Sequence, residues 1–520
     1  MQPDLAQLRR HPREMARWEQ AKAHLFAGQY GVALAGYRRL LERYPAVPEL
    51  WFELGNAAAG ELDFTAANRA YQRALELAPR NARLLLLIGQ QYQGLRQLDQ
   101  ARSCFERAVT AEPDLMDAKI SLALWFERER RLAEAWDCVE QCLAKNAKDD
   151  QARYLRAFLL HRQGRHAEAE TALRELVGSE VKYPYVKYAS RHLLGVVLDQ
   201  LGQFAEAWRW LGEAKALVRQ ITDTALLERE YDRASQRRRE LLVELKTELL
   251  EKWRREPVQQ EGGEQVAFLG GHPRSGTTLL EQILDAHPDA LAFDEPAAFS
   301  QEVAGRLVQN QGGAGLTLSA LDGVDATKRE QLRRRYRVSL LQEVAGQSQA
   351  RVLLDKNPSG TMLLHLWLRV FPEVKVIVAL RDPRDVIISC YFQNLMLNAT
   401  NVNFLSIERT AQHYADLMDV WLRLRDLGGF DWLETRYEDV VANLEAEGKR
   451  VTEFLGLTWH ANQARYYETA RRKFLYAPTY HDVTQPVYRR AVGRWERYAE
   501  VLEPVRARLA PYCRAFGYGF

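Results

Sequence analysis

A chain of 520 residues is too long for a single hydrophobic core, and its 47% of apolar residues can fill two or three domains. The net charge of +3 is small for this length, which argues against a nucleic-acid coat or a basic membrane-binding surface, so any preference for anions must be local. The five cysteines have no metal-site spacing, and their odd number argues against a complete disulfide set. With a charged N-terminus and no apolar run of membrane-spanning length, we expect a cytoplasmic protein.

Residues 1–220 repeat with a period of 34 residues. Two columns of small residues keep this interval, and a column of mostly larger apolar residues follows the second by four positions. The columns are Gly55, Gly89, Ala123 and Ala157; Ala33, Ala67, Ala101, Ala135 and Ala169; and Tyr37, Tyr71, Phe105, Val139 and Leu173. Small residues let paired helices approach closely, while large ones fill the groove between pairs. The pattern predicts an all-α solenoid.

The period, the small residues and prolines at Pro45, Pro79 and Pro113 resemble the tetratricopeptide repeat. The segment FAEAWRW, with Ala207, extends the pattern. The resemblance implies a surface that binds a protein or peptide. A scaffold that orients or dimerises the other half is the alternative, and a homodimer is compatible with it. Residues 221–262 follow as a charged connecting helix and linker.

Residues 263–520 have a different pattern, in which short apolar runs alternate with helical segments. The runs VAFLGG, VLLDK and VKVIVALRD are each followed by an amphipathic stretch, which predicts a parallel sheet covered by helices. Ligands of such α/β domains bind beyond the carboxyl ends of the strands. Each of the three runs ends in polar residues, so we expect the functional site there.

The first of these ends reads GHPRSGTT from Gly271, which is the register of a nucleotide phosphate-binding loop with Thr277 in place of the usual lysine. Backbone N–H groups and the start of the following helix can hold a phosphate. The side chains and backbone expected to bind it are those of Arg274, Ser275, Gly276, Thr277 and Thr278. No acidic residue suited to Mg²⁺ follows the later strand VIVAL. A donor with one 5′-phosphate would need neither the lysine nor a metal.

The loop PRSGTT, the following LDAHPD and the segment ALRDPRDVIISCYFQ together resemble sulfotransferases that use 3′-phosphoadenylyl sulfate (PAPS). Among these the C-terminal half is most similar to the protein-tyrosine sulfotransferases, and the two halves together resemble bacterial tetratricopeptide-repeat sulfotransferases. The resemblance implies an α/β fold with a P-loop-like site, PAPS as co-substrate, no metal, and transfer of a sulfuryl group to an acceptor hydroxyl.

The resemblance also implies residue roles. Arg381 and Ser389, eight residues apart, match the pair that holds the 3′-phosphate of the nucleotide. Glu295 matches the general base by its distance of 21 residues from Arg274, with Asp294 the less favoured neighbour and a helix-capping role the alternative. Lys356, at the end of the second strand, matches the lysine that stabilises the leaving phosphate together with Arg274.

Three further segments extend the resemblance. Tyr437 resembles a tyrosine that lines the nucleotide site, and Arg494 takes the place of a lysine in the segment that closes over the nucleotide. Thr479 or Tyr480 falls near a phosphate-contacting serine.

The acceptor is not determined by these matches. Protein tyrosine is favoured, although the stretch PAAFSQEVAGR after Glu295 lacks the arginines expected to bind an acidic peptide. A carbohydrate or small-molecule hydroxyl is the alternative within the same reaction class. Two other hypotheses are a magnesium-dependent nucleotide kinase with a variant loop and a nucleotide-binding solenoid adaptor without catalysis.

Overall fold

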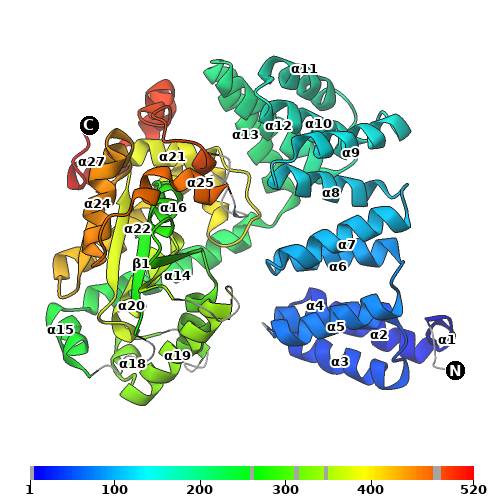
Figure 1. The fold of residues 1–520 in the computed structure, drawn as a ribbon, viewed down its shortest axis with the longest axis horizontal. Helices are drawn as coiled ribbons and strands as arrows, with labels where there is room; N and C mark the ends of the chain where they lie inside the picture. Colours follow the sequence, from blue (N-terminus) through cyan, green and yellow to red (C-terminus); the bar gives the residue numbers. More distant parts are fainter. Residues whose placement is uncertain are drawn as a thin grey trace. The chain divides into compact units, whose positions relative to one another are not determined.

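The computed structural model describes residues 5–61, 63–257, 263–309, 316–342, 344, 349–471 and 482–519. The chain divides into two compact units, an N-terminal unit of Met1–Leu201 and a C-terminal unit of Gly202–Phe520 (Figure 1).

The described part of the N-terminal unit is helical, and successive helices pack as pairs. Its helices are α1 (Leu5–Arg9), α2 (Pro12–Phe26), α3 (Tyr30–Arg43), α4 (Pro48–Gly60), α5 (Phe64–Leu77), α6 (Ala82–Gly94), α7 (Leu98–Ala111), α8 (Met116–Arg128), α9 (Leu132–Lys145), α10 (Asp150–Arg162), α11 (His166–Val177) and α12 (Pro184–Gln200).

The predicted residue columns form the contacts within these pairs. A Cβ on Gly55 would lie 2.4 Å from the ring of Tyr71, and a Cβ on Gly89 would lie 2.7 Å from the ring of Phe105. Small residues on the first helix therefore make room for the aromatic residue of the second. The prediction of a tetratricopeptide-repeat solenoid is confirmed.

The C-terminal unit begins with three helices, α13 (Phe204–Ile221), α14 (Thr224–Glu244) and α15 (Thr247–Arg255). The predicted charged connecting helix is thus divided at Leu245, and both of its parts bury one face. Tyr231 and Ser235 on α14 are buried, as are Leu250 and Trp253 on α15. The domain boundaries given from the sequence stay a prediction.

A parallel five-stranded sheet forms the centre of the C-terminal unit, as the alternating pattern predicts. Its strands are β1 (Gln265–Gly271), β2 (Ala290–Asp294), β3 (Val352–Lys356), β4 (Lys375–Leu380) and β5 (Trp432–Arg436), in the order β2-β3-β1-β4-β5. The helices of the described part are α16 (Thr277–Asp285), α17 (Arg306–Gln309), α18 (Leu318–Asp322), α19 (Ala326–Gln342), α20 (Leu364–Val370), α21 (Pro383–Tyr391), α22 (Ile407–Leu427), α23 (Tyr437–Ala442), α24 (Leu444–Phe454), α25 (Tyr466–Ala470), α26 (Ala499–Leu502) and α27 (Arg506–Ala515).

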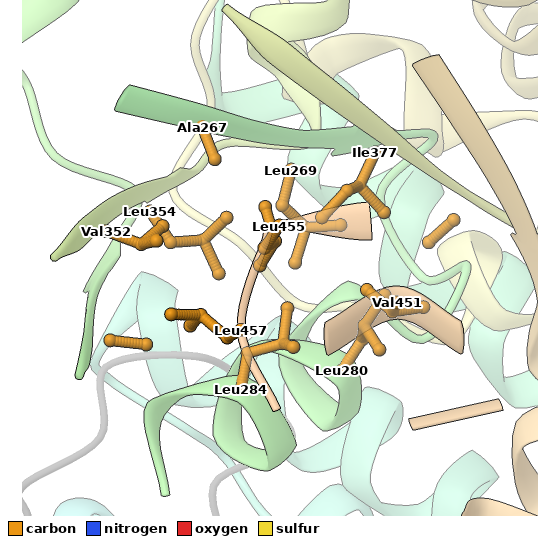
Figure 2. Close-up of a cluster of buried hydrophobic side chains, with 12 residues drawn as sticks. Ala267, Leu269, Leu280, Leu284, Val352, Leu354, Ile377, Val451, Leu455 and Leu457 are labelled. Atoms are coloured by element: carbon orange, nitrogen blue, oxygen red, sulfur yellow. The ribbon is translucent and has the colours of Figure 1, made fainter. Parts of the chain in front are cut away.

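Both faces of the sheet are buried. On one face, Leu269 of β1 packs in a core with Leu280 of α16 and Val451 of α24 (Figure 2). The neighbouring residue of β1, Phe268, points to the other face and its ring lies 5.3 Å from that of Trp367 on α20. This alternation along one strand is typical of a sheet between two helical layers.

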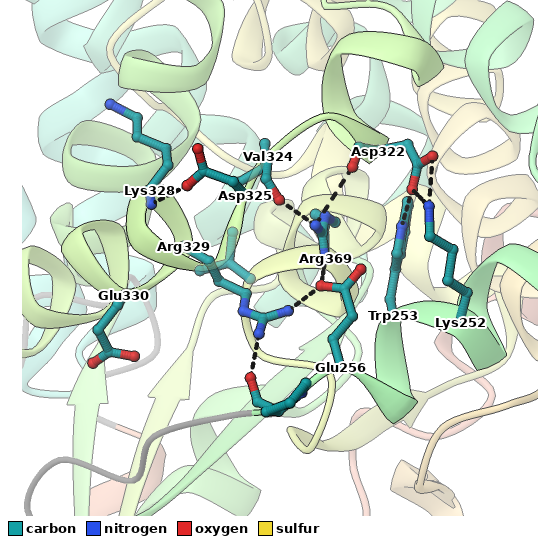
Figure 3. Close-up of polar contacts among 12 residues, drawn as sticks. Lys252, Trp253, Glu256, Asp322, Val324, Asp325, Lys328, Arg329, Glu330 and Arg369 are labelled. Atoms are coloured by element: carbon teal, nitrogen blue, oxygen red, sulfur yellow. Dashed lines mark hydrogen bonds and ion pairs between the residues drawn. The ribbon is translucent and has the colours of Figure 1, made fainter.

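A polar network fastens the segment after α15 to the sheet domain (Figure 3). The carboxylate of Glu256 accepts hydrogen bonds from Arg329 of α19 and, at 2.7 Å, from Nη1 of Arg369 of α20. Trp253 donates to Asp322 at 2.9 Å. Arg329 and Arg369 are 2% and 1% exposed, so Glu256 compensates two buried guanidinium groups. Helix α15 is therefore part of the C-terminal unit.

Candidate functional site

The tips of four neighbouring strands carry the predicted site residues. In the register of the sheet, Lys356 at the end of β3 lies opposite Asp294 of β2 on one side and Leu269 of β1 on the other. Gly271 of β1 lies opposite Ala379 of β4. The parallel arrangement therefore gathers residues that are more than one hundred positions apart in the chain at one edge.

The loop after β1 needs glycine at two positions. Gly271 has φ 123°, and a Cβ there would lie 2.2 Å from the carbonyl oxygen of Ala379. Gly276 has φ 87°, and a Cβ would lie 2.6 Å from the ring of Tyr437. The two glycines let the loop turn close to β4 and lead directly into α16, whose first residue is Thr277. Backbone N–H groups at such a helix start favour an anion.

Arg274 lies between the two phosphate positions expected from the sequence. Its Nε donates a hydrogen bond to Oγ of Ser389 at 3.0 Å, and its carbonyl oxygen accepts one from Nη1 of Arg381 at 3.1 Å. Its φ of 76° is unusual for a residue with a side chain and stores strain in the loop. Burial lowers the pKa of Arg274, and the nearby charge of Arg381 adds to this effect. The loop thus holds two guanidinium groups close together.

Arg381 and Ser389, the predicted pair for a 3′-phosphate, both lie at this edge and are 6% exposed. The hydroxyl of Ser389 accepts its hydrogen bond from Arg274 and not from Arg381. Nη2 of Arg381 donates to the carbonyl oxygen of Ala491 and lies 3.6 Å from Asp385. Its Nε is buried and has no hydrogen-bond partner among the described residues. An unpaired buried donor on a cation is the kind of group that an anionic ligand satisfies.

Lys356 is completely buried and has three carboxylates around it. Nζ donates to Oδ1 of Asp294, lies 3.3 Å from Oε1 of Glu295 and lies 3.7 Å from Oε2 of Glu281. Burial alone lowers the pKa of this ammonium, but the carboxylates outweigh burial and raise it. Lys356 therefore stays charged and is held at the strand tips.

Glu281 is a residue of this cluster that the sequence analysis missed. It lies on α16 and its side chain is 3% exposed. The available signal was an acidic residue inside the apolar helical run TTLLEQIL, because a buried carboxylate needs a partner.

Glu295 differs from its neighbour Asp294 in exposure. The Glu295 side chain is 51% exposed and that of Asp294 is 14% exposed. Glu295 has φ 51°, and its backbone N–H donates to the carbonyl oxygen of Lys356 at 2.8 Å. The strained turn after β2 thus presents the carboxylate of Glu295 to solvent beside Lys356.

Tyr437 lies against this loop, and Arg494 lies beside the residue that follows α21. Tyr437 opens α23, and its ring lies against Gly276 and 5.0 Å from the guanidinium carbon of Arg381. The guanidinium carbon of Arg494 lies 4.0 Å from the ring centroid of Phe392, which directly follows α21. Thr479 and Tyr480 lie outside the described residues.

Asp385 holds the segment that carries Arg494, and the sequence analysis missed it as well. Its carboxylate accepts backbone hydrogen bonds from Gly493 at 2.9 Å and Trp495 at 2.8 Å. Asp385 follows the DPR motif on α21 and is 1% exposed. It therefore connects the C-terminal segment to the helix that carries Ser389.

His272 occupies a buried position in the loop after β1. It is fully buried in the loop, its Nδ1 donates to the carbonyl oxygen of Pro273 at 2.7 Å, and its Nε2 lies 2.8 Å from Nδ1 of His413. Burial lowers the pKa of His272 to about 4. The ring is thus neutral at pH 7, and His413 donates to it.

Among the described residues, no group of three or more His, Cys, Asp or Glu side chains has the geometry of a metal site. Among the helices of the described ranges, none combines the length and the apolar character required to cross a bilayer.

Comparison with known families assigns both units. Residues 267–461 match the model of the Sulfotransferase family, and residues 19–82, 86–137 and 135–187 match a model of the Tetratricopeptide repeat. The first range contains every residue discussed for the loop, the cluster around Lys356 and helix α21.

Relatives of known name align with half of the chain or less. Protein-tyrosine sulfotransferase 2 of Gallus gallus is 24% identical over 278 residues, which covers 49% of this chain and 69% of the relative. Protein-tyrosine sulfotransferase 1 of Danio rerio is 25% identical over 285 residues, with 49% and 75% covered. Nodulation protein NoeE of Sinorhizobium fredii (strain NBRC 101917 / NGR234) is 34% identical over 122 residues, with 23% and 29% covered.

Solved structures include neighbours of each unit. The sulfotransferase domain of the Synechococcus PCC 7002 olefin synthase is 19% identical with a TM-score of 0.35, covering 51% of this chain and all of that domain. Pseudomonas aeruginosa PilF is 20% identical with a TM-score of 0.32, covering 39% and 90%. These scores are too low to decide the fold, which the structure shows directly. The repeats and the strand-tip site, together with the two family matches, identify a chain that combines tetratricopeptide repeats with a domain of the sulfotransferase family.

Proposed function

We propose that the enzyme transfers a sulfuryl group from PAPS to an acceptor hydroxyl, most favourably that of a tyrosine in a protein bound by the repeats. The observation that carries this proposal is the convergence of a glycine-requiring loop, the half-buried Arg274, the buried Arg381 and the buried Lys356 at one edge of the sheet. The separate anion-binding positions suit a nucleotide with phosphates at both its 5′ and 3′ positions.

The residues present fit such a nucleotide. The loop turn at Gly276 leaves backbone N–H groups and the hydroxyls of Ser275, Thr277 and Thr278 for the 5′-phosphate. The unpaired Nε of Arg381 and the hydroxyl of Ser389 supply donors for the 3′-phosphate. Tyr437 and Arg494 border these positions. The nucleotide supplies the activated sulfuryl group, and the side chains bind and orient it.

Three side chains carry the chemistry in this proposal. Glu295 takes the proton of the acceptor hydroxyl, whose oxygen forms the new bond to sulfur while the bond between sulfur and the phosphate oxygen breaks. Lys356 and Arg274 stabilise the negative charge that develops on the leaving phosphate. The half-exposed carboxylate of Glu295 suits a base that meets an incoming acceptor better than the more buried Asp294 does.

Protein tyrosine is supported as acceptor by the names of the relatives and by the repeats, which favour a polypeptide partner. One observation favours a carbohydrate or small-molecule hydroxyl instead. The first basic residue after Glu295 is Arg306, and it pairs with Glu302 at 2.8 Å. An acidic peptide would therefore lack a cation at the positions directly after the base.

Two measurements test the proposal. Glu295→Gln is expected to bind adenosine 3′,5′-bisphosphate as the wild type does, while its turnover with radiolabelled PAPS falls about 10²–10⁴-fold. Asp294→Asn is the matched comparison and should lose less turnover. Full activity of Glu295→Gln would remove it from the mechanism. Calorimetry that shows binding of ATP with a divalent ion but none of the bisphosphate would favour the kinase hypothesis.

The acceptor needs its own experiment. Incubation of the enzyme with radiolabelled PAPS and host lysate, followed by separation of protein, glycan and lipid fractions, identifies the class that takes up the label. Label in protein that survives as sulfotyrosine supports the tyrosine acceptor, and label in glycan contradicts it. Absence of label from every fraction, with intact nucleotide binding, would favour the adaptor hypothesis.

A further inference from the structure

Helix α13 packs against the helix that carries Ser389. The ring of Trp208 stacks on that of Tyr391 with centroids 4.3 Å apart and an interplanar angle of 19°. Trp208 and Phe204 also contact the ring of Tyr498, at 5.6 and 5.8 Å. Helix α13, the last helix of the repeat pattern, therefore packs against one side of α21 within the transferase unit.

Lys215 lies in the contact between α13 and α21, and no described carboxylate is within ion-pair distance of it. It is 5% exposed, and its Nζ lies 4.6 Å from the ring centroid of Tyr391. Among the described residues its hydrogen-bond acceptor is the carbonyl oxygen of Gln393, at 3.4 Å. The side chain of Gln393 in turn donates to the carbonyl oxygen of Ser389 at 2.9 Å. A buried ammonium with one long hydrogen bond costs free energy unless another charge compensates it.

The charged groups near Lys215 do not supply that compensation. Burial lowers the pKa of Lys215 to about 7, the thiol of Cys390 opposes this effect, and Arg219 on the same helix adds to it. Burial also raises the pKa of Cys390 to about 12, so the thiol carries no charge at pH 7. The charge of Glu408 acts on Tyr391, and those of Arg274 and Arg381 act on Cys390. The charge of Arg219 is paired with Glu228 of α14 at 2.9 Å. Among the described residues, neither carboxylate is within ion-pair distance of Lys215.

We propose that Lys215 is a positioning residue of the nucleotide site. Its ammonium group gains a compensating negative charge when a phosphate dianion binds beside Ser389. The proposal rests on the proposed function, because it needs a phosphate at that position. The ammonium acts through the end of α21. It donates to the backbone carbonyl oxygen of Gln393, and the side chain of Gln393 donates to the backbone carbonyl oxygen of Ser389. The phosphate and the proton on Lys215 stabilise one another, since binding coupling is reciprocal.

The coupling has a direct thermodynamic consequence. At a pH near its pKa, Lys215 is about half protonated, so binding of a dianion takes up as much as about half a proton per nucleotide at pH 7. A lysine that only fills space would leave proton uptake unchanged. Proton uptake therefore separates the proposed role from a purely structural one.

The test is calorimetry of adenosine 3′,5′-bisphosphate binding to the full chain at pH 7, in buffers of different ionisation enthalpy. Lys215→Met is expected to lose the proton uptake and to bind about three- to tenfold more weakly, while its melting temperature stays equal or rises because a buried charge is removed. Lys246→Met, at an exposed lysine at the start of α15, should change neither quantity. Lys215→Arg keeps the charge and is expected to lose the proton uptake with less loss of affinity.

The outcomes separate this inference from the proposed function. If the wild type does not bind the bisphosphate, the proposed function fails. If the wild type binds and Lys215→Met binds with the same affinity and the same proton uptake, the role of Lys215 is refuted while the proposed function stands. If Lys215→Met does not fold, the Lys215→Arg variant is used instead. Proton uptake by Lys215→Arg equal to that of the wild type would refute the role of Lys215.

Discussion

The charge of Lys356 is the strongest single target for a test of the site. Three carboxylates share this ammonium, and the Glu281 side chain is 3% exposed beside a lysine that is fully buried. Lys356→Met keeps the length and most of the volume of the side chain but removes its charge. The variant leaves Glu281, Asp294 and Glu295 close together without their cation.

The expected loss of stability follows from burial. Breaking a buried ion pair by removal of one partner costs about 3–5 kcal/mol, because the other charge stays buried and uncompensated. The contact with Glu295 adds little, since its side chain is half exposed and such pairs contribute about 1 kcal/mol or less. We therefore expect Lys356→Met to lose about 3–5 kcal/mol of unfolding free energy at pH 8.

The double variant Lys356→Met/Glu281→Gln separates stability from catalysis. Removing the charge of Glu281 as well should restore about 2 kcal/mol or more of the lost stability, because fewer carboxylates then repel one another. Turnover should remain about 10²–10³-fold below wild type in both variants, because the charge that stabilises the leaving phosphate is still missing. Urea unfolding at pH 8, with turnover measured in parallel, gives both quantities.

Two results would contradict this account. Wild-type stability of Lys356→Met at pH 8, or no recovery in the double variant, would mean that the lysine does not compensate Glu281. Wild-type turnover of a folded Lys356→Met variant would remove Lys356 from the reaction.

Two further predictions concern the loop after β1. Gly271→Ala places a Cβ 2.2 Å from a carbonyl oxygen of β4, so it should lower the free energy of unfolding by about 2–4 kcal/mol and remove most of the nucleotide affinity. Gly456→Ala is the control, because Gly456 has φ 74° and open space around it, and it should lower the free energy of unfolding by only about 1 kcal/mol. Equal losses in urea unfolding would contradict the steric explanation. Because the pKa of His272 is lowered to about 4, its stabilising contribution is complete above pH 6.5 and is lost as pH falls from 6.5 to 4. The decline of unfolding free energy across that window should be about 3 kcal/mol smaller in His272→Asn, and an unchanged decline would show that His272 does not cause it.

The repeat columns and the strand tips were predictable because each depends on local rules. A residue that recurs every 34 positions must occupy the same place in each helix pair, so Gly55 and Tyr71 could be matched without a structure. Likewise, polar residues that follow an apolar strand must lie at the carboxyl edge of a parallel sheet. Lys356 and Arg381 lie at such strand ends, whereas Glu295 was identified by the resemblance to a family residue that lies 21 positions after Arg274.

The remaining site residues depend on tertiary packing. Glu281 and Asp385 lie inside helices, where sequence alone does not tell a buried acid from a solvated one. The bond from Arg274 to Ser389 requires the relative placement of β1 and α21, and spacing along the chain does not give it. Helix α13 continues the repeat pattern through Ala207, yet its Trp208 packs on Tyr391 of the transferase unit. The pattern identifies the type of helix but not its neighbours.

The strand order also gives the site a direction. Because the sheet runs β2-β3-β1-β4, the carboxylates of Asp294 and Glu295 lie at one end of the row of strand tips and the guanidinium of Arg381 lies at the other. Lys356 on β3 and Arg274 after β1 stand between these ends. A negatively charged nucleotide is favoured on the β1–β4 side and repelled from the β2 side, while a hydroxyl that must lose a proton is favoured beside the carboxylates. We infer that the acceptor approaches from the β2 side, so the sulfuryl group moves along the row of strand tips past Lys356.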